Sequence, residues 1–103
     1  LLLGVTYKPN IADQRESPAV PLAKQLADRG AVVQYHDPHV TEWRALGDRA
    51  TRVEDAAAGV TEADLVILVQ NHKEYDVDAL AANAQRFFDT RGVAVEGEKV
   101  SRL

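Results

Sequence analysis

The sequence predicts one α/β domain that occupies residues 1–103, with a mostly parallel sheet as the middle of three layers and helices on both faces. Short apolar runs alternate along the chain with segments whose apolar residues recur at helical spacing. The run DLVILVQ at residues 64–70 is apolar almost throughout, which is typical of a strand buried on both faces in the centre of a parallel sheet. A length of 103 residues suits one compact domain.

The first third of the chain predicts a strand, a long loop and a helix. Residues 1–6 form an apolar run, which indicates a buried strand, and the polar, proline-containing residues 7–17 indicate a loop. A helix is expected from Pro18, because Ser17 can accept a hydrogen bond from the first turn and proline is tolerated at the first helical position. Gly30 can supply the left-handed residue that ends this helix. The apolar residues at helical spacing are Val20, Ala23, Leu26 and Ala27.

The remaining elements follow from the same patterns. A β-branched run at residues 31–35 predicts a strand that closes at the turn His36-Asp37-Pro38, and residues 41–51 predict a loop with one helical turn. Further predicted elements are helices at 54–62 and 77–84, strands at 64–70 and 86–89, and a weak final strand near 93–95. Strands that alternate with helices in this way form right-handed crossovers and therefore a parallel sheet.

The composition limits the chemistry that this chain can perform. The formal net charge is −4, from 12 Lys and Arg against 16 Asp and Glu, so there is no basic excess to bind nucleic acid. The absence of cysteine excludes disulfides, thiolate metal sites and cysteine nucleophiles in this chain. No apolar run approaches the ~20 residues of a membrane span, and we expect a cytoplasmic protein without nucleic-acid or membrane partners. Because the chain begins inside an apolar strand and without methionine, we expect it to be a fragment of a longer protein.

The predicted topology brings cations to one edge of the sheet. Ligands of parallel sheets bind beyond the carboxyl ends of the strands, where we expect residues 7–17, the turn after the second strand, the loop at 71–73 and the turn at 90–91. Lys8 would follow the first strand and Arg91 the strand at 86–89, and both side chains suit phosphate oxygens. The N-terminus of the helix that begins at Pro18 would point free N–H groups to the same edge. Ordinary solvated loop cations are the alternative interpretation.

A dinucleotide-binding turn is not expected here. Such a turn needs three glycines between the first strand and the first helix, whereas this stretch contains only Gly4, followed by bulky and charged residues. Asp37 ends the second strand, where a ribose-binding carboxylate could lie, but it comes too far after Gly4 for the usual spacing. We therefore expect that this chain alone binds no NAD.

Three blocks of the sequence carry a family resemblance. The segment GVTYKPNIADQRESPA that begins at Gly4, the segment VVQYHDP after Gly30, and DTRG at residues 89–92 resemble, in order and spacing, the C-terminal domain of the UDP-glucose/GDP-mannose dehydrogenase family. The resemblance implies a Rossmann-like fold that binds the UDP part of a nucleotide sugar. It also implies that Lys8 and Arg91 contact the nucleotide sugar, while Tyr7 borders the same site through its main chain and ring.

Three further residues of the first block have an expected supporting role. We expect Asp13, Arg15 and Ser17 to fix the loop, with Ser17 as the helix cap and Asp13 paired with Arg15 in a buried or half-buried position. A direct contact between Arg15 and the ligand is the alternative.

The three histidines are expected to be turn or surface residues. His36, His39 and His72 show no metal-ligand spacing on one element and have no cysteine or acidic partners in a ligand pattern. We therefore expect no metal site, and we expect His36 and Asp37 to shape the turn after the second strand.

The family resemblance also implies an activity for the longer protein. That family oxidises the sugar C6 alcohol to a carboxylate in two NAD-dependent steps, through a covalent intermediate on a cysteine. The resemblance implies an N-terminal domain that binds NAD and a central segment that makes a homo-oligomer, so we expect this chain to be inactive by itself. The turn YHDP, the histidine of QNHKEYD and the DTRG block look closest to enzymes that oxidise UDP-N-acetylglucosamine, with UDP-glucose as the other expected substrate. A stand-alone Rossmann-like regulatory or interaction module without catalysis is the alternative.

Overall fold

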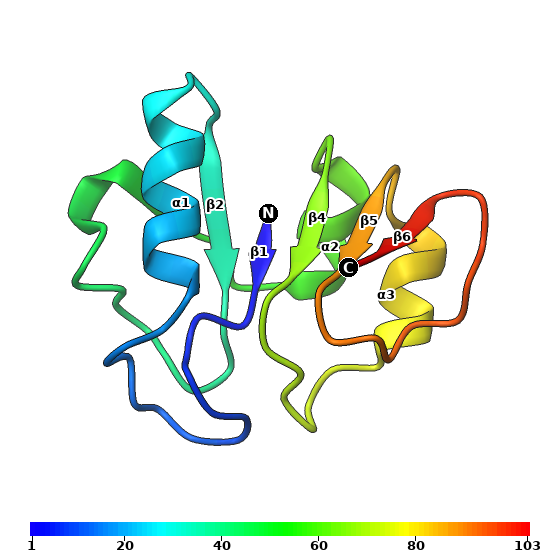
Figure 1. The fold of residues 1–103 in the computed structure, drawn as a ribbon, viewed down its shortest axis with the longest axis horizontal. Coiled ribbons are helices and arrows are strands. Elements are labelled where there is room, and N and C mark those ends of the chain that lie inside the picture. The colour runs from blue at the N-terminus through cyan, green and yellow to red at the C-terminus, as the bar shows by residue number, and fades with distance from the viewer.

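The computed structural model describes residues 1–103 as one six-stranded, all-parallel sheet with three helices (Figure 1). The strand order is β3-β2-β1-β4-β5-β6. The strands are β1 (Leu2–Leu3), β2 (Val33–His36), β3 (Ala50–Arg52), β4 (Val66–Leu68), β5 (Phe87–Asp89) and β6 (Val100–Arg102). The helices are α1 (Ala19–Asp28), α2 (Ala56–Glu62) and α3 (Val77–Asn83), with a short 3-10 turn, η1 (Gly47–Arg49), before β3. None of these helices is both long and apolar enough to cross a membrane.

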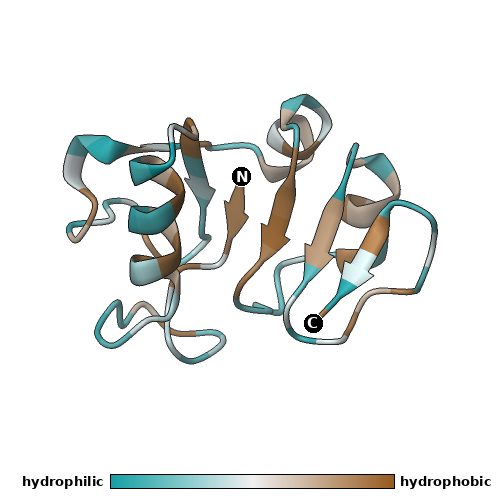
Figure 2. Cartoon of the chain, turned by 45° about the horizontal axis from the view of Figure 1, so that its top comes forward, coloured by the Kyte–Doolittle hydropathy of each residue, from teal (hydrophilic) through white to brown (hydrophobic).

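Consecutive strand residues pack against opposite layers of helices. Leu2 lies in a core cluster with Ala19 and Ala23 of α1, whereas its neighbour Leu3 lies in a second cluster with Val60 of α2 and Leu80 of α3. The side chains of a strand alternate between the two faces of a sheet, so α1 covers one face and α2 and α3 cover the other. The apolar colour of β1 and β4 in Figure 2 matches their central, doubly covered position.

The predicted three-layer α/β fold is confirmed, and two strands differ from the prediction. Residues 41–51 were expected to form a loop with one helical turn, but they also lead into β3, a three-residue edge strand that pairs only with β2. The last strand is β6 at Val100–Arg102 rather than residues 93–95. Both are edge strands with few apolar residues, so neither carries the continuous apolar run of a central strand.

The order of the strands reverses at β1. Leu2 is in register with Tyr35 of β2 on one side and with Ile67 of β4 on the other, so β1 lies between the two halves of the sheet. Loops that follow β1 and β4 leave toward opposite halves, and the crevice between them is the usual ligand site of such a sheet. In Figure 1, β2, β1, β4 and β5 all point toward the lower side of the view, where the loops at residues 7–17 and 70–76 and the turn after β5 lie.

Helix α1 begins and ends close to the predicted residues. The hydroxyl oxygen of Ser17 accepts a hydrogen bond from the backbone N–H of Ala19 at 3.2 Å, and the Ser17 side chain is buried. The helix therefore starts at Ala19, one residue later than Pro18. At the other end, Gly30 adopts the expected left-handed conformation, with φ at 92°.

The Ser17 hydroxyl should contribute measurably to stability. We expect Ser17→Ala to lower the free energy of unfolding by about 1 kcal/mol, because the N–H of Ala19 loses its acceptor. Urea unfolding followed by the fluorescence of Trp43, the single tryptophan, measures this difference. Ser101→Ala, at an exposed serine of β6, is the matched control and should leave the midpoint unchanged. Equal midpoints for the two variants would contradict this role of Ser17.

Candidate functional site

The buried polar side chains of this protein gather at the carboxyl edge of the sheet. Apart from them, the buried residues are apolar residues and glycines. Burying a polar side chain costs free energy unless it has hydrogen-bond partners. We therefore take this cluster of buried polar side chains as the candidate functional site. Its members follow or end strands, or precede α1: Thr6, Ser17, Asp37, Gln70, His72 and Asp89.

Gly4 brings the segments that leave β1 and β4 into contact. Its φ is 79°, in the left-handed region, and a Cβ atom at this position would lie 2.4 Å from the carbonyl oxygen of Gln70. Glycine is required here for a close approach of two backbones.

The loop that carries Tyr7 and Lys8 is held through its main chain. The side-chain amide of Gln70 donates to the carbonyl of Tyr7 at 2.7 Å, and the hydroxyl of Thr6 donates to the carbonyl of Lys8 at 2.7 Å. At the end of this loop, Asn10 has a φ of 64°, and its side-chain oxygen accepts from the backbone N–H of Lys73 at 2.6 Å. The backbone is thus fixed, while the side chains of Tyr7 and Lys8 stay exposed.

A fully buried pair, Asp37 and His72, lies below this loop. Nε2 of His72 lies 2.8 Å from a carboxylate oxygen of Asp37, and Nδ1 of His72 accepts from the backbone N–H of Asn10 at 2.8 Å. Since Nδ1 accepts the N–H of Asn10, the ring hydrogen that faces Asp37 lies on Nε2, which donates to the carboxylate. His72 was expected to be a turn or surface histidine. It does begin a turn, since its carbonyl accepts from the N–H of Tyr75 at 3.0 Å, but its exposure of 0% shows that it is not a surface residue.

Asp37 shapes the turn after β2, as expected, and also binds the segment that follows β1. One carboxylate oxygen accepts from the N–H of His39 at 2.8 Å, and the other accepts from the N–H of Val5 at 2.8 Å. This side chain therefore connects the segment after β1, the turn after β2 and the loop after β4. No pattern in the sequence indicates its interactions with Val5 and His72, because these partners are 32 and 35 positions away.

His36 contributes to the same edge through Tyr75. The hydroxyl of Tyr75 donates to the carbonyl of His36 at 2.9 Å and lies 2.9 Å from its Nδ1. Burial, with a smaller effect of the Arg52 charge, lowers the pKa of His36, so this histidine is neutral at pH 7. Burial raises the pKa of Tyr75, so its hydroxyl keeps its proton as a donor.

The turn that carries Arg91 is built around the carboxylate of Asp89. This side chain, with 0% exposure, accepts four backbone N–H groups, from Arg91, Gly92, Val93 and Ala94, at 2.6–2.9 Å. Burial alone would raise the pKa of Asp89, but the four donors outweigh it and lower the pKa. The same bonds explain why residues 93–95 form no strand, since Val93 and Ala94 donate to Asp89 instead.

The pair formed by Asp13 and Arg15 is present but exposed. The guanidinium of Arg15 donates to the Asp13 carboxylate at 2.8 Å, and the side chains are 87% and 38% exposed, respectively. The prediction of a buried or half-buried pair was therefore wrong for Arg15, whereas Asp13 is half-buried. The side-chain hydrogen bond from Arg15 lowers the pKa of Asp13 to about 2. An exposed pair of this kind fixes the local backbone more than it stabilises the fold.

Three cations at the carboxyl edge have no partner in the protein. Lys8 follows β1, Lys73 follows β4 and Arg91 follows β5, and each side chain is exposed. Their side chains make no hydrogen bond or ion pair, in contrast to Arg15, Arg49, Arg52 and Arg102, which pair with carboxylates. Lys73 was not singled out by the sequence, because a lone loop lysine has no distinguishing pattern.

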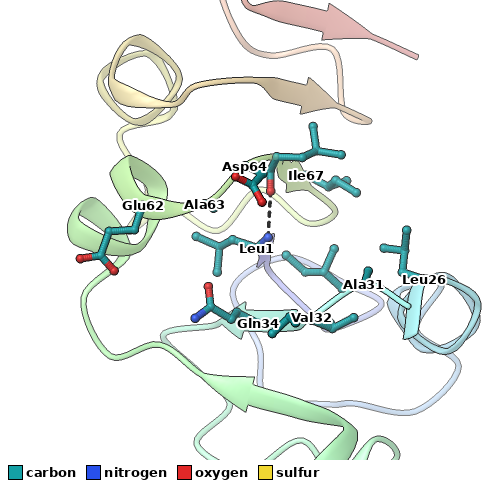
Figure 3. Close-up of a pocket in the computed structure, with 12 residues that line it drawn as sticks. Leu1, Leu26, Ala31, Val32, Gln34, Glu62, Ala63, Asp64 and Ile67 are labelled. Atoms are coloured by element: carbon teal, nitrogen blue, oxygen red, sulfur yellow. Dashed lines mark hydrogen bonds between the residues drawn. The ribbon is translucent and has the colours of Figure 1, made fainter. Parts of the chain in front are cut away.

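An apolar pocket of about 290 Å³ lies at the opposite, amino edge of the sheet (Figure 3). It is lined by residues that precede strands, among them Leu1, Val32 and Leu65, and the amino group of Leu1 donates to the carbonyl of Leu65 at 2.8 Å. It contains no lysine or arginine side chain and none of the buried polar residues. The charged edge, not this pocket, is therefore the candidate site for an anionic ligand.

Comparisons with known proteins cover almost the whole chain. The sequence model of the UDP-glucose/GDP-mannose dehydrogenase family, UDP binding domain, matches residues 1–96. The UDP-glucose 6-dehydrogenase of Rhizobium meliloti (strain 1021) is 35% identical over 75 residues, which make up 72% of this chain and 17% of that protein. The UDP-N-acetyl-D-mannosamine dehydrogenase of Methanococcus maripaludis is 29% identical over 97 residues, which make up 89% of this chain and 22% of that protein.

A solved structure shares the fold. The UDP-glucose dehydrogenase from the hyperthermophilic archaeon Pyrobaculum islandicum superposes with a TM-score of 0.78 at 35% identity, over 97% of this chain and 25% of that one. This chain thus spans between 17% and 25% of the length of these relatives.

Proposed function

The chain belongs to the UDP-glucose/GDP-mannose dehydrogenase family, as a UDP-binding domain, and on that premise we propose that it binds the UDP part of a UDP-sugar at its carboxyl edge. Lys8 and Arg91 bind the diphosphate oxygens in this proposal, and Tyr7 borders the nucleotide. The observation that carries it is the pair of exposed, unpaired cations on rigidly held loops that follow β1 and β5. Charged donors to phosphate form the strongest hydrogen bonds available to a protein.

The loops support this role through their preorganisation. The main chain of the Lys8 loop is fixed by Gln70 and Thr6, and the Arg91 turn is fixed by Asp89. A ligand that binds to groups already held in place loses less conformational entropy on binding. Because the net charge of the chain is −4, the attraction for an anion has to come from these local cations.

The oxidation itself is proposed to occur in another part of a longer enzyme. This chain has no cysteine nucleophile and no glycine-rich NAD turn, so NAD would be bound mainly by an N-terminal domain, with a central segment forming a homo-oligomer. Binding energy from the diphosphate would place the C6 alcohol of the sugar against the reacting groups. The proposed substrate is UDP-N-acetylglucosamine or UDP-glucose.

A nuclear magnetic resonance titration tests the proposal. UDP added to the ¹⁵N-labelled chain should shift the backbone amides of Lys8, Arg91 and Gly92, while the amide of Arg86, at the amino end of β5, should stay unchanged. NAD should shift none of them. UDP-glucose and UDP-N-acetylglucosamine, added separately, rank the two proposed sugars. Shifts with NAD and none with UDP would refute the proposal and would favour a regulatory or interaction module instead.

A further inference from the structure

We infer that His72, held by Asp37, is a positioning residue that fixes the Lys8 loop in the conformation that binds the diphosphate. This inference rests on the proposed function and deepens it. His72 contributes no direct contact to the ligand in this account. Its imidazole connects two segments that come from β1 and β2, and it does so with both ring nitrogens.

The first contact is with the end of the Lys8 loop. Nδ1 of His72 accepts from the backbone N–H of Asn10 at 2.8 Å, and Asn10 is the residue at which the chain turns with a φ of 64°. Asparagine is one of the few non-glycine residues that adopt this conformation readily. The hydrogen bond from the Asn10 N–H to His72 holds this turn in place two residues after Lys8.

The second contact orients the ring. Nε2 of His72 lies 2.8 Å from the Asp37 carboxylate and 3.4 Å from the hydroxyl of Thr6, which itself donates to the carbonyl of Lys8. Asp37 is in turn fixed by the N–H groups of Val5 and His39. The carboxylate thus selects the tautomer with the proton on Nε2, which leaves Nδ1 free to accept from Asn10.

The segment from Tyr7 to Asn10, which carries Lys8, is held at its two ends by different groups. Gln70 and Thr6 hold the carbonyls of Tyr7 and Lys8, at the start of the loop. Only His72 and the N–H of Lys73 hold Asn10, at its end. Loss of the acceptor at Nδ1 should therefore free the end of the loop while the fold persists.

Two substitutions of His72 separate its two hydrogen bonds. The amide of asparagine reaches the position of Nδ1, so His72→Asn retains an acceptor for the N–H of Asn10. The amide of glutamine reaches the position of Nε2, so His72→Gln retains a donor to Asp37 and loses that acceptor. We expect His72→Gln to raise the Kd for UDP about tenfold and to speed hydrogen exchange at the Asn10 amide by a similar factor, as for one lost hydrogen bond. His72→Asn should retain more of both properties.

A control separates positioning from stability. Tyr75→Phe removes the hydroxyl that donates to His36, beside the His72 ring, but it leaves the contact between His72 and Asn10 in place. It should lower Tm with little change in the Kd for UDP. Calorimetric titration with UDP, exchange at Asn10 and thermal unfolding are measured for all four proteins.

The outcomes distinguish this inference from the proposed function. Failure of the unsubstituted chain to bind UDP overturns both. If the unsubstituted chain binds UDP, and His72→Gln binds it equally well with unchanged exchange at Asn10, the proposed function stands and the positioning role is wrong. The positioning role is also wrong if the Kd of every variant, Tyr75→Phe included, rises only in proportion to the loss of Tm.

Discussion

Replacement of Asp89 by alanine is expected to lower the free energy of unfolding by roughly 4 kcal/mol. Four backbone N–H groups lose their acceptor, of which the N–H of Ala94 is buried and the other three are partly buried. An unsatisfied buried donor costs about 1–3 kcal/mol, and water recovers part of this cost at the three partly buried groups. Urea unfolding followed by the fluorescence of Trp43 measures the loss. Asp48→Ala, at an exposed residue of η1, should change stability by less than about 0.5 kcal/mol.

The Asp89 contribution should also depend on pH in a defined direction. The folded pKa of Asp89 lies below its ordinary value, so the stabilisation is fully present above the unfolded pKa of about 3.9 and is lost as the pH falls toward the folded pKa. The difference in stability between the unsubstituted protein and Asp89→Asn should therefore be constant from pH 7 to 5 and shrink below about pH 4. A difference that grows with acidity would contradict this account.

The central strand β4 and the helix α1 could be predicted because the sequence features that indicate them lie within the elements or directly beside them. The apolar run at residues 64–70 identified β4, and the pair Ser17 and Gly30 set the ends of α1 to within a residue or two. Strands at sheet edges were not predictable. β3 and β6 gain their structure from pairing with one neighbour, and that pairing depends on where the rest of the sheet lies.

The position of the candidate site could be predicted, but not the interactions that build it. Parallel topology is enough to bring Lys8 and Arg91 to the same edge of the sheet. The supports beneath them are contacts between residues far apart in the sequence, such as His72 with Asp37 and with Asn10, which lie 35 and 62 positions apart. No spacing rule within one element describes such pairs, which is why His72 was expected at the surface.

Removal of either Lys8 or Arg91 should cause the largest loss of affinity for UDP. We expect Lys8→Ala and Arg91→Ala each to raise the Kd for UDP by about 10-fold to 100-fold, because each charge-assisted hydrogen bond to phosphate contributes roughly 1.5–3 kcal/mol. Arg91→Lys should recover part of the loss, since it restores the charge but not the two-pronged geometry of the guanidinium. The affinity of the unsubstituted chain should fall as salt is raised, and this dependence should weaken in each alanine variant.

Two matched cations away from the carboxyl edge test whether the loss of UDP affinity depends on where a cation lies or only on the net charge. Arg86 stands at the amino end of β5 and Lys24 within α1, and both are exposed without an ion pair. Arg86→Ala and Lys24→Ala remove the same charges as the two site variants, so a purely general electrostatic effect would weaken UDP binding equally in all four. Calorimetric titrations at one salt concentration compare them. Because screening is strong beyond about 10 Å in ordinary buffers, we expect the two control variants to bind UDP within about twofold of the unsubstituted chain, and an equal loss in all four would place the diphosphate elsewhere.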